Sequence, residues 1–584
     1  MAGALTASRP PHVHRRHRWR IKAKRGGGQS ARPERYYFGI SSVVNMTDEA
    51  PVLIAGGGLV GLSAAAFLAS HGIRSLTFER LTASSPLPRA AFFHMRTLEM
   101  FRSIGIEEAV RSQSEKEFVP DGAIIAMDTL SGRKLADIIP NLNEGVDALS
   151  PCRRLFLNQP SLERILRNCA HEGGATIVPG AEIVDVHQDS TGVNLTIRKA
   201  SDGRMHDVRG DYLIAADGGH SRVRAALGIG YEGRGAFSNS LTIYFTADLA
   251  PYIGDNPWSL IYVNNPTLRG FFRLNRAATA GFLGVNVLGD PQLDADAAVN
   301  AATDLSESRL IELVRAGVGK RDLPVRIDGY SRWRATANVA RRLRDGRVFI
   351  AGDAAHLMPP NGGFGGNTGI HDAHNLAWKL ALVIKGLAGS GLLDSYETER
   401  KPVAVFTVEQ SFSRYVARTA PWLAARVQPA PLVDDLRIEL GYLYDSPLGV
   451  HADPRSTCGA PGSRAPHLWL ERRGQRVSTI DLAGGRYVLF AGGAGSAWAD
   501  AAKEAANRRG GLPLDAYCIG RDLADPGAQF LPGFGISSSG ASLVRPDGFV
   551  AWRCPDHATE PAAVLHAALG ASLKDSLTPG AQGK

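Results

Sequence analysis

The chain has 584 residues, more than one ordinary domain, so about two to four domains are expected. A hydrophobic content of 44% with 21% charged residues excludes a chain that is disordered throughout. The five cysteines are widely spaced without a CxxC pair, which excludes a disulfide scaffold or a zinc ribbon and favours a reducing compartment, so we expect a cytoplasmic protein.

The net charge of +9 belongs to the N-terminal segment. Residues 1–45 hold ten of the 66 Lys and Arg residues and one of the 57 Asp and Glu residues, so the remaining chain is neutral. This balance argues against a nucleic-acid partner for the folded part. We expect the segment to be disordered, because it has no hydrophobic periodicity. A targeting peptide and a nucleic-acid arm are alternatives, but a native start at Met46 is favoured.

The first folded elements form a strand–turn–helix–strand unit. A buried strand at 51–55 leads into a glycine-rich turn, an alanine-rich helix that ends near Gly72, and a second strand that ends at Glu79. The glycines of a G-x-G-x-x-G pattern allow a tight turn and bring backbone amides close to a pyrophosphate at the helix N-terminus. Glu79 would accept hydrogen bonds from ribose hydroxyls. The unit predicts a dinucleotide site at Gly56, Gly58, Gly61 and Glu79, and it fits NAD and FAD equally well.

A second match to the same pattern, at Gly228, Gly230 and Gly233, lacks this context. It follows a segment with helical character and precedes no helical period, so we expect a turn without a ligand.

Two later strands each end in a turn that carries an aspartate. A strand at 211–215 precedes Asp217 and a helix that runs through Leu227, and helix capping is an alternative role for this acid. A strand at 347–351 precedes Asp353, a glycine-rich loop at 362–368 and a helix to about Lys385. Asp353 would accept a ribityl or ribose hydroxyl. The loop amides and the helix N-terminus would stabilise negative charge at the N1–C2 edge of a reduced flavin, which favours FAD.

No apolar run reaches the length of a membrane-spanning helix. The best candidate, 376–393, is interrupted by Lys379, Lys385 and several glycines, so no membrane partner is expected. The sixteen histidines include no HExxH and no paired Cys/His spacing, so no metal site is expected.

Three motifs in this order resemble the class A flavoprotein monooxygenases, the single-component FAD-dependent aromatic hydroxylases. They are GGGLVG with Glu79, AADGGHSRVR, and AGDAAHLMPPNGGFGGNTGIHDAHNLAWKL, and the last is similar to the branch of phenol hydroxylases and polyketide hydroxylases. The resemblance covers about 46–571. It implies an α/β fold in which a Rossmann-like FAD-binding domain is interleaved with a β-sheet substrate domain, followed by a C-terminal thioredoxin-like domain that lacks CxxC.

The implied organisation has five parts. They are a disordered basic tail or mis-assigned start (1–45), the first part of the FAD-binding domain (46–237), a substrate-binding sheet domain (238–330), the second part of the FAD-binding domain with a helical linker (331–455), and the thioredoxin-like domain (456–584).

The resemblance also implies a bound FAD, NADPH or NADH as a transient co-substrate, and O2. The oxygen would pass through a C4a-hydroperoxyflavin to a phenolic or polycyclic polyketide-type substrate. Baeyer–Villiger insertion into a ketone, or a flavin-binding scaffold without turnover, are the alternatives, and a homodimer is possible. The implied FAD contacts are Gly56, Gly58, Gly61, Glu79, Arg89, Gln159, Asp217, Asp353, Gly363, Gly366 and Asn367.

Residues 238–287 alternate as strands do and are rich in aromatic side chains. In relatives a sheet here covers the substrate above the flavin, and a flat aromatic substrate would suit such a wall. A phenol is activated when it is held as the phenolate. Tyr244, Tyr262 and Arg273 are the catalytic candidates for holding that oxygen, and the sequence does not choose among them.

Overall fold

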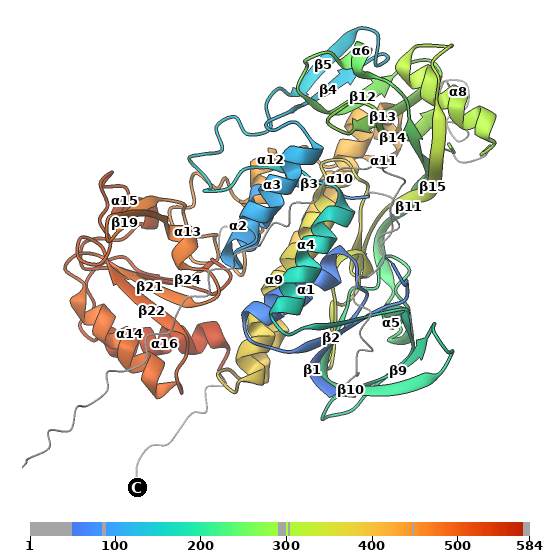
Figure 1. The fold of residues 1–584 in the computed structure, drawn as a ribbon. Coiled ribbons are helices and arrows are strands. Elements are labelled where there is room, and N and C mark those ends of the chain that lie inside the picture. The colour runs from blue at the N-terminus through green and yellow to red at the C-terminus, as the bar shows by residue number, and fades with distance from the viewer. Residues whose placement is uncertain (1–48, 84–88, 290–299, 302–303, 447–448, 576–584) are drawn as a thin grey trace, which may run out of the picture. The chain divides into compact units, whose positions relative to one another are not determined.

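Two eight-stranded sheets and one four-stranded sheet organise the computed structural model (Figure 1), which describes residues 49–83, 89–289, 300–301, 304–446 and 449–575. The first sheet has the order β16-β17-β10-β1-β2-β7, and β8 and β9 continue it as a hairpin paired with β10. Its strands are β1 (Glu49–Ala55), β2 (Ser75–Glu79), β7 (Thr176–Pro179), β8 (Ala181–Gln188), β9 (Val193–Lys199), β10 (Met205–Ala215), β16 (Arg344–Asp345) and β17 (Val348–Ile350). The expected tail at 1–45 lies outside the described residues.

The centre of this sheet is parallel and covered on both faces, which explains why its strands are continuous apolar runs. In β1, Val52 and Ile54 join the core formed with the helices, whereas Leu53 and Ala55 join a second core on the side of β8 and β9. The covering helices lie together in Figure 1 and are α1 (Leu59–Ser70), α4 (Gln159–Glu172) and α9 (Phe364–Ile384). None of the described helices has both the length and the apolar composition required to cross a membrane.

The second sheet has the order β18-β15-β11-β14-β13-β12-β4-β5. It is wider than the expected segment 238–330, because β4 and β5 come from the preceding region and β11 begins at Tyr231. Pairing between strands so far apart in the chain leaves no local pattern in the sequence. The strands are β4 (Ala123–Met127), β5 (Lys134–Ile139), β11 (Tyr231–Thr246), β12 (Trp258–Asn264), β13 (Leu268–Leu274), β14 (Ala280–Leu288), β15 (Arg326–Ala340) and β18 (His356–Leu357), with α6 (Ala250–Ile253) and α8 (Glu307–Val318) beside them.

Short elements connect the two sheets on the side of the glycine turns. They are β3 (Phe92–Phe93), α2 (Met95–Ser103), α3 (Glu107–Glu117), β6 (Leu155–Phe156), α5 (Arg222–Ala226) and the 3-10 turn η1 (Gly352–Ala354). The long helix α10 (Ser395–Arg418) follows the turn η2 (Ser390–Asp394) and leads into η3 (Pro421–Leu423), α11 (Ala424–Val427) and α12 (Asp435–Glu439). Gly228 ends the α5 turn as expected, but Gly233 lies within β11 at a β-bulge, so the second glycine pattern carries no helix.

The C-terminal region is a mixed sheet in the order β22-β21-β23-β24, in which β21 and β22 are parallel and the other pairs are antiparallel. This arrangement is compatible with the expected thioredoxin-like domain. Its elements are β19 (Trp469–Arg472), β20 (Gln475–Ser478), α13 (Thr479–Leu482), β21 (Tyr487–Ala491), α14 (Ser496–Arg508), β22 (Leu514–Cys518), α15 (Phe530–Phe534), β23 (Ala541–Val544), β24 (Val550–Cys554) and α16 (Pro561–Leu573).

Buried ion pairs join this region to the helices of the first sheet. Glu99 of α2 accepts a hydrogen bond from Arg464 Nε at 2.9 Å, and Glu399 of α10 is paired with Arg545 at 2.7 Å. The side chains of Arg464 and Glu99 are both almost fully buried. Burial alone would raise the pKa of Glu99, but Arg464 and Arg96 outweigh it and lower the pKa to about 2. The C-terminal region is therefore attached to α2 and α10 through buried ion pairs, in which the arginine keeps its carboxylate partner ionised.

Candidate functional site

The first glycine turn leaves room for a ligand at one position and none at the others. Gly56 has a φ of 98°, and a Cβ there would lie 2.4 Å from the Ala216 carbonyl oxygen. A Cβ on Gly61 would lie 1.9 Å from the Gly56 carbonyl oxygen, so this glycine allows α1 to pack against the turn. Gly58 differs, because its Cβ would meet only Glu163 Oε1, at 3.9 Å. The space beside Gly58 is at the N-terminus of α1.

The N-terminus of α1 is suited to an anion. Gly58 is its N-cap, no side chain caps it, and its first turn contains no acidic residue. The unpaired N–H groups and the helix dipole therefore carry positive potential next to the open space. A pyrophosphate would fit this position, where the sequence predicts one.

Glu79 braces the same turn. Its Oε2 accepts from the Gly57 N–H at 2.7 Å, and its Oε1 accepts from the Leu81 N–H at 2.9 Å. The sequence predicts ribose hydroxyls as its partners. Because each carboxylate oxygen can accept a second hydrogen bond, a ribose contact remains compatible with this structural role.

The structure shows the capping role that the sequence left open for Asp217, and one carboxylate oxygen remains for the predicted ligand role. Its Oδ2 accepts from the N–H groups of Arg222 and Val223 at 2.8 and 3.3 Å, which caps α5. Its Oδ1 is buried and has no hydrogen-bond partner among the residues that the structure describes. A buried carboxylate oxygen without a donor is costly, so this atom is ready to accept a hydroxyl of a ligand.

Asp353 lies in the η1 turn directly after β17. Its side chain is accessible to solvent yet surrounded by protein on most sides, and this partial desolvation raises its pKa. The preceding Gly352 has a φ of 61°, and a Cβ there would lie 2.7 Å from Val60 Cγ2 of α1. The Asp353 turn and the first glycine turn are therefore adjacent.

Helix α9 begins at Phe364, earlier than expected. The sequence places Gly366 and Asn367 in a loop before the helix, whereas the structure places them in its first turn, with Gly363 (φ of 70°) as the N-cap. The left-handed conformation of Gly363 starts the helix abruptly. This N-terminus also lacks a side-chain cap and an acidic residue, so its N–H groups can receive the negative edge of a flavin.

The Asn367 side chain is fully used within the protein. Its Oδ1 accepts from the His94 N–H at 3.0 Å and from Thr97 Oγ1 at 2.6 Å, and its Nδ2 donates to the carbonyl oxygens of Phe92 and Gly363, both at 2.8 Å. Any contact of Asn367 with a flavin would therefore involve its backbone. Asn367 thus holds the glycine turn in place.

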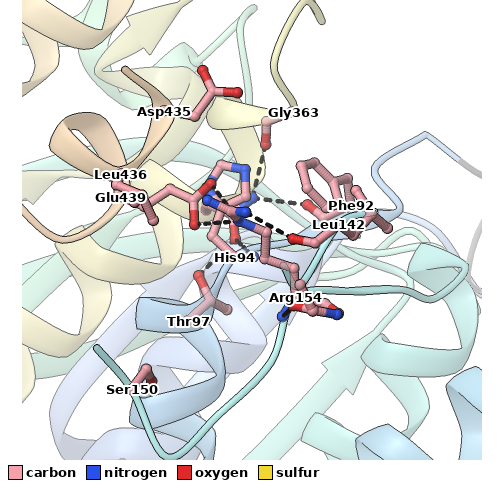
Figure 2. A network of polar contacts seen from close by, with 12 residues as sticks. Phe92, His94, Thr97, Leu142, Ser150, Arg154, Gly363, Asp435, Leu436 and Glu439 are labelled. Carbon is pink, nitrogen blue, oxygen red and sulfur yellow. Dashed lines mark hydrogen bonds and ion pairs between the residues drawn. The ribbon is translucent and has the colours of Figure 1, made fainter. Parts of the chain in front are cut away.

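His94 is a positioning residue that sequence reasoning missed. Its Nε2 lies 3.1 Å from the Gly362 carbonyl oxygen, and its ring packs edge-on against Phe92 and Phe364. Figure 2 shows His94 between Phe92, Thr97 and Gly363, with the Arg154–Glu439 ion pair beside it. Burial lowers the pKa of His94, so the ring is neutral at pH 7. No sequence signal distinguishes this histidine from the other fifteen.

Gln159, the first residue of α4, contacts the segment that follows Arg89. Gln159 Oε1 accepts from the Ala90 N–H at 3.1 Å, and its Nε2 donates to Glu163 Oε1 at 2.8 Å. Gln159 therefore ties the segment after Arg89 to α4. The Arg89 side chain is exposed.

The three candidates for the substrate oxygen lie on one face of the second sheet. Tyr244 of β11 and Arg273 of β13 are each directly opposite Phe282 of β14, and Tyr262 of β12 is opposite Phe271 of β13. Alternate residues of a strand share a face, so these five side chains lie on the same side. The opposite face carries the core that packs against α8.

Arg273 is a buried cation without a carboxylate partner. It is 5% exposed, and among the described residues its hydrogen-bond partner is Asn158 Oδ1 at 3.3 Å. Its guanidinium carbon lies 4.4 Å from the centre of the Phe282 ring. Burial lowers its pKa to about 9, so the group is charged at neutral pH. Burial also raises the pKa of Tyr244, which therefore keeps its proton. A charge that is buried without a counterion favours an anionic ligand.

These features fit FAD beside an aromatic substrate. The space at Gly58 and the N-terminus of α1 could hold a pyrophosphate, and the N-terminus of α9 could face a pyrimidine edge. Asp217 Oδ1, which has no donor within the described residues, could accept a hydroxyl. Within the described part of the chain, no group of three or more His, Cys, Asp or Glu residues could hold a metal ion.

Comparisons with known proteins agree with this geometry. A family model described as an FAD binding domain matches residues 49–411, and one described as aromatic-ring hydroxylase, C-terminal, matches residues 459–573. The chain is 48% identical to a 4-methyl-5-nitrocatechol 5-monooxygenase of Burkholderia sp, over 90% of this chain and 98% of that protein. It is 37% identical to a tetracenomycin A2 monooxygenase-dioxygenase of Streptomyces glaucescens, over 91% and 99%. A crystal structure of aklavinone-11 hydroxylase with FAD and aklavinone is similar with a TM-score of 0.84 at 34% identity, over 91% and 100%.

Proposed function

Because the chain belongs to the class A flavoprotein monooxygenases, which are FAD-dependent aromatic-ring hydroxylases using NAD(P)H and O2, we propose that it hydroxylates an acidic phenol bound as its phenolate. The observation that carries this proposal is the buried Arg273 guanidinium, which has no carboxylate partner among the described residues. A phenolate would supply the missing negative charge, and ionisation makes the adjacent ring carbons more nucleophilic.

The chain's own groups bind and orient the two reactants. The N–H groups at the start of α1 would hold the pyrophosphate, Asp217 Oδ1 and Asp353 would each accept a hydroxyl, and the N–H groups at the start of α9 would face the flavin pyrimidine. When bound, FAD takes up the electrons of NAD(P)H and activates O2 for transfer to the ring. Arg89, whose exposed side chain lies shortly before β3, is proposed to lie on the path of the nicotinamide.

The sheet face would place the ring over the flavin. Arg273 would bind the phenolate oxygen, and Tyr244, which keeps its proton, would donate a second hydrogen bond. Tyr262, Phe271 and Phe282 form the aromatic wall against which a flat ring can stack. This covering also excludes water from the reacting atoms.

The first substrate class to test is the nitrophenols. A nitro group lowers the pKa of a phenol, so that the anion that suits Arg273 is already present at neutral pH. The relative that is 48% identical is named for a nitrocatechol, which supports this choice. The named tetracenomycin and aklavinone relatives make polycyclic phenols the second class. We also infer a reducing, cytoplasmic location, which the five unpaired cysteines support.

The test compares a phenol with its methyl ether. The purified protein should show a flavin spectrum, and 4-methyl-5-nitrocatechol should stimulate NAD(P)H oxidation with one atom of ¹⁸O2 incorporated, whereas the O-methylated analogue should not. Arg273→Gln should lower kcat/KM for the phenol about 10- to 100-fold, since a hydrogen bond to a charged group contributes about 1.5–3 kcal/mol.

Arg273→Lys is the matched control, because it keeps the charge and should retain part of the activity. An equal effect of Arg273→Gln on ionised and methylated substrates would contradict the phenolate proposal. A lactone or ester product would point to Baeyer–Villiger insertion, and flavin binding without substrate-stimulated NAD(P)H oxidation would point to a scaffold.

A further inference from the structure

A fully buried ion pair lies behind the turns that are proposed to hold the flavin. It joins Asp372 of α9 to Arg400 of α10, and neither side chain is accessible to solvent. Asp372 Oδ1 accepts from Arg400 Nε at 2.7 Å. Its Oδ2 lies 3.1 Å from the Gly352 backbone nitrogen, which donates to it, and 2.7 Å from His356 Nε2. Asp372 therefore holds both ends of the short segment that contains Asp353.

Arg400 holds the other side of the same site. Its NH2 group donates to the Thr368 carbonyl oxygen at 3.2 Å, within the first turns of α9, and its NH1 group donates to the Tyr444 hydroxyl at 3.0 Å. Helix α9 and the Asp353 turn also touch directly, since a Cβ on Gly369 would lie 2.9 Å from Gly352 Cα. The pair thus sets the spacing between the Asp353 turn and the N-terminal turns of α9.

The Asp372–Arg400 pair is better explained by the backbone positions that it fixes than by a gain in folding stability. Burying two charges costs several kcal/mol per ion, so an isolated buried pair contributes little net stabilisation. Burial alone would raise the pKa of Asp372, but Arg400 and His356 outweigh it and hold the pKa below its ordinary value. Both groups are therefore charged at neutral pH, and their hydrogen bonds to Gly352 and Thr368 keep a fixed direction.

We propose that Asp372 and Arg400 are positioning residues that set the affinity for FAD and the reduction potential of the bound flavin. This inference rests on the proposed function, in which the Asp353 turn binds a hydroxyl of the cofactor and the N-terminus of α9 faces its pyrimidine edge. The negative charge of a reduced flavin gathers at that edge, so its stabilisation depends on how closely the helix N–H groups approach. A pair that fixes this approach favours the reduced form.

The same two helices provide a matched control. Lys379 and Glu399 also form a buried ion pair, at 2.7 Å, two turns further along α9. Glu399 is bonded to Asn375 and Arg545 instead of to the flavin turns. Disrupting this pair removes a comparable buried interaction while leaving Gly352 and Thr368 in place.

The experiment compares Asp372→Asn and Arg400→Lys with Glu399→Gln. In Asp372→Asn the amide NH2 would oppose either the Gly352 N–H or the Arg400 guanidinium, so one bond is lost. Arg400→Lys keeps the charge but cannot reach Asp372, Thr368 and Tyr444 together. We expect both variants to bind FAD at least tenfold more weakly when the apoprotein is titrated. We expect their flavin midpoint potential to fall by about 30 mV, which corresponds to a tenfold loss of preference for the reduced form.

The control separates positioning from stability. Glu399→Gln should lower the melting temperature of the apoprotein to a similar degree and leave the potential of the bound flavin unchanged. Equal shifts of potential in all three variants, or none in Asp372→Asn and Arg400→Lys, would overturn the inference. If Asp372→Asn does not fold, the charge-conserving Arg400→Lys carries the test. A wild-type protein that takes up no FAD would contradict the proposed function itself, and this inference with it.

Discussion

Neighbouring glycines in the first turn serve different purposes. Gly61 is required by the fold, since the helix α1 could not approach the turn with a side chain at that position. Gly58 has backbone angles (φ of −84°, ψ of −168°) that other residues adopt, and its Cβ would meet open space. Folding therefore does not require a glycine at position 58, whereas a pyrophosphate at the start of α1 does.

Two alanine substitutions separate these purposes. We expect Gly58→Ala to keep the melting temperature of the apoprotein within a few degrees and to weaken FAD binding about tenfold or more, because the added methyl group occupies the ligand space. Gly61→Ala should instead destabilise the apoprotein by about 1–3 kcal/mol through overpacking. Thermal unfolding and FAD titration of both variants measure this difference. Unchanged FAD affinity in Gly58→Ala would contradict the proposed pyrophosphate site.

At the scale of elements, the N-terminus of α9 is held from outside the helix. Asn367 donates to the carbonyl oxygens of Phe92 and Gly363 and accepts from His94 and Thr97. The motif around Asn367 predicts a loop that contacts the flavin. The structure adds that the side chain acts by connecting α9 to the segment from β3 to α2.

Replacing Asn367 with aspartate tests this connection. Asn367→Asp removes both donors, leaves the two carbonyl oxygens unpaired and buries a negative charge, so the free energy of unfolding should fall by about 2–4 kcal/mol. Thr97→Ser, which keeps the hydroxyl bonded to Asn367, should remain close to wild type. Urea unfolding of the apoproteins measures both values. A fall of less than about 1 kcal/mol in Asn367→Asp would show that the connection matters little.

At the scale of the whole molecule, the attachment of the C-terminal region depends on pH. Glu99 has an ordinary pKa of 4.5, which is lowered to about 2 in the folded protein. A carboxyl with a lowered pKa stabilises the folded state above its unfolded pKa, and this contribution is lost as the pH falls toward the folded pKa. The stabilisation that the Arg464–Glu99 contact provides should therefore be complete at pH 5 and fall progressively below about pH 4.5, because the carboxyl of the unfolded chain binds a proton there while the folded one is still ionised.

Glu99→Gln isolates this contribution. At pH 7 the variant should be about 3 kcal/mol less stable than wild type, since each pKa unit corresponds to about 1.4 kcal/mol. The difference between the two proteins should be constant above about pH 5 and should shrink between pH 4.5 and pH 3, because Glu99 of the unfolded wild-type chain binds a proton there. Urea unfolding of both proteins across this range tests the prediction. A difference that does not change with pH would show that the charge of Glu99 is not responsible.

The sequence by itself determined the cofactor and the chemical class. The βαβ unit with Gly56, Gly58 and Gly61, and the turns that carry Asp217 and Asp353, are local patterns in which a strand, a turn and a helix follow one another. Short segments encode such patterns, because consecutive residues determine the backbone conformation of a glycine turn and the apolar content of a buried strand. The comparisons confirmed the family that these motifs predict.

Only the tertiary structure decided which side chains remain available to ligands. The side chains of Asn367 and Gln159 form hydrogen bonds within the protein. Among the described residues, Asp217 Oδ1 has no donor and the Arg273 guanidinium has no carboxylate partner. These states depend on contacts such as those between Asn367 and His94, which are 273 positions apart in the chain. Hydrogen-bond capacity and burial are properties of the assembled neighbourhood, and the order of residues along one segment does not contain them.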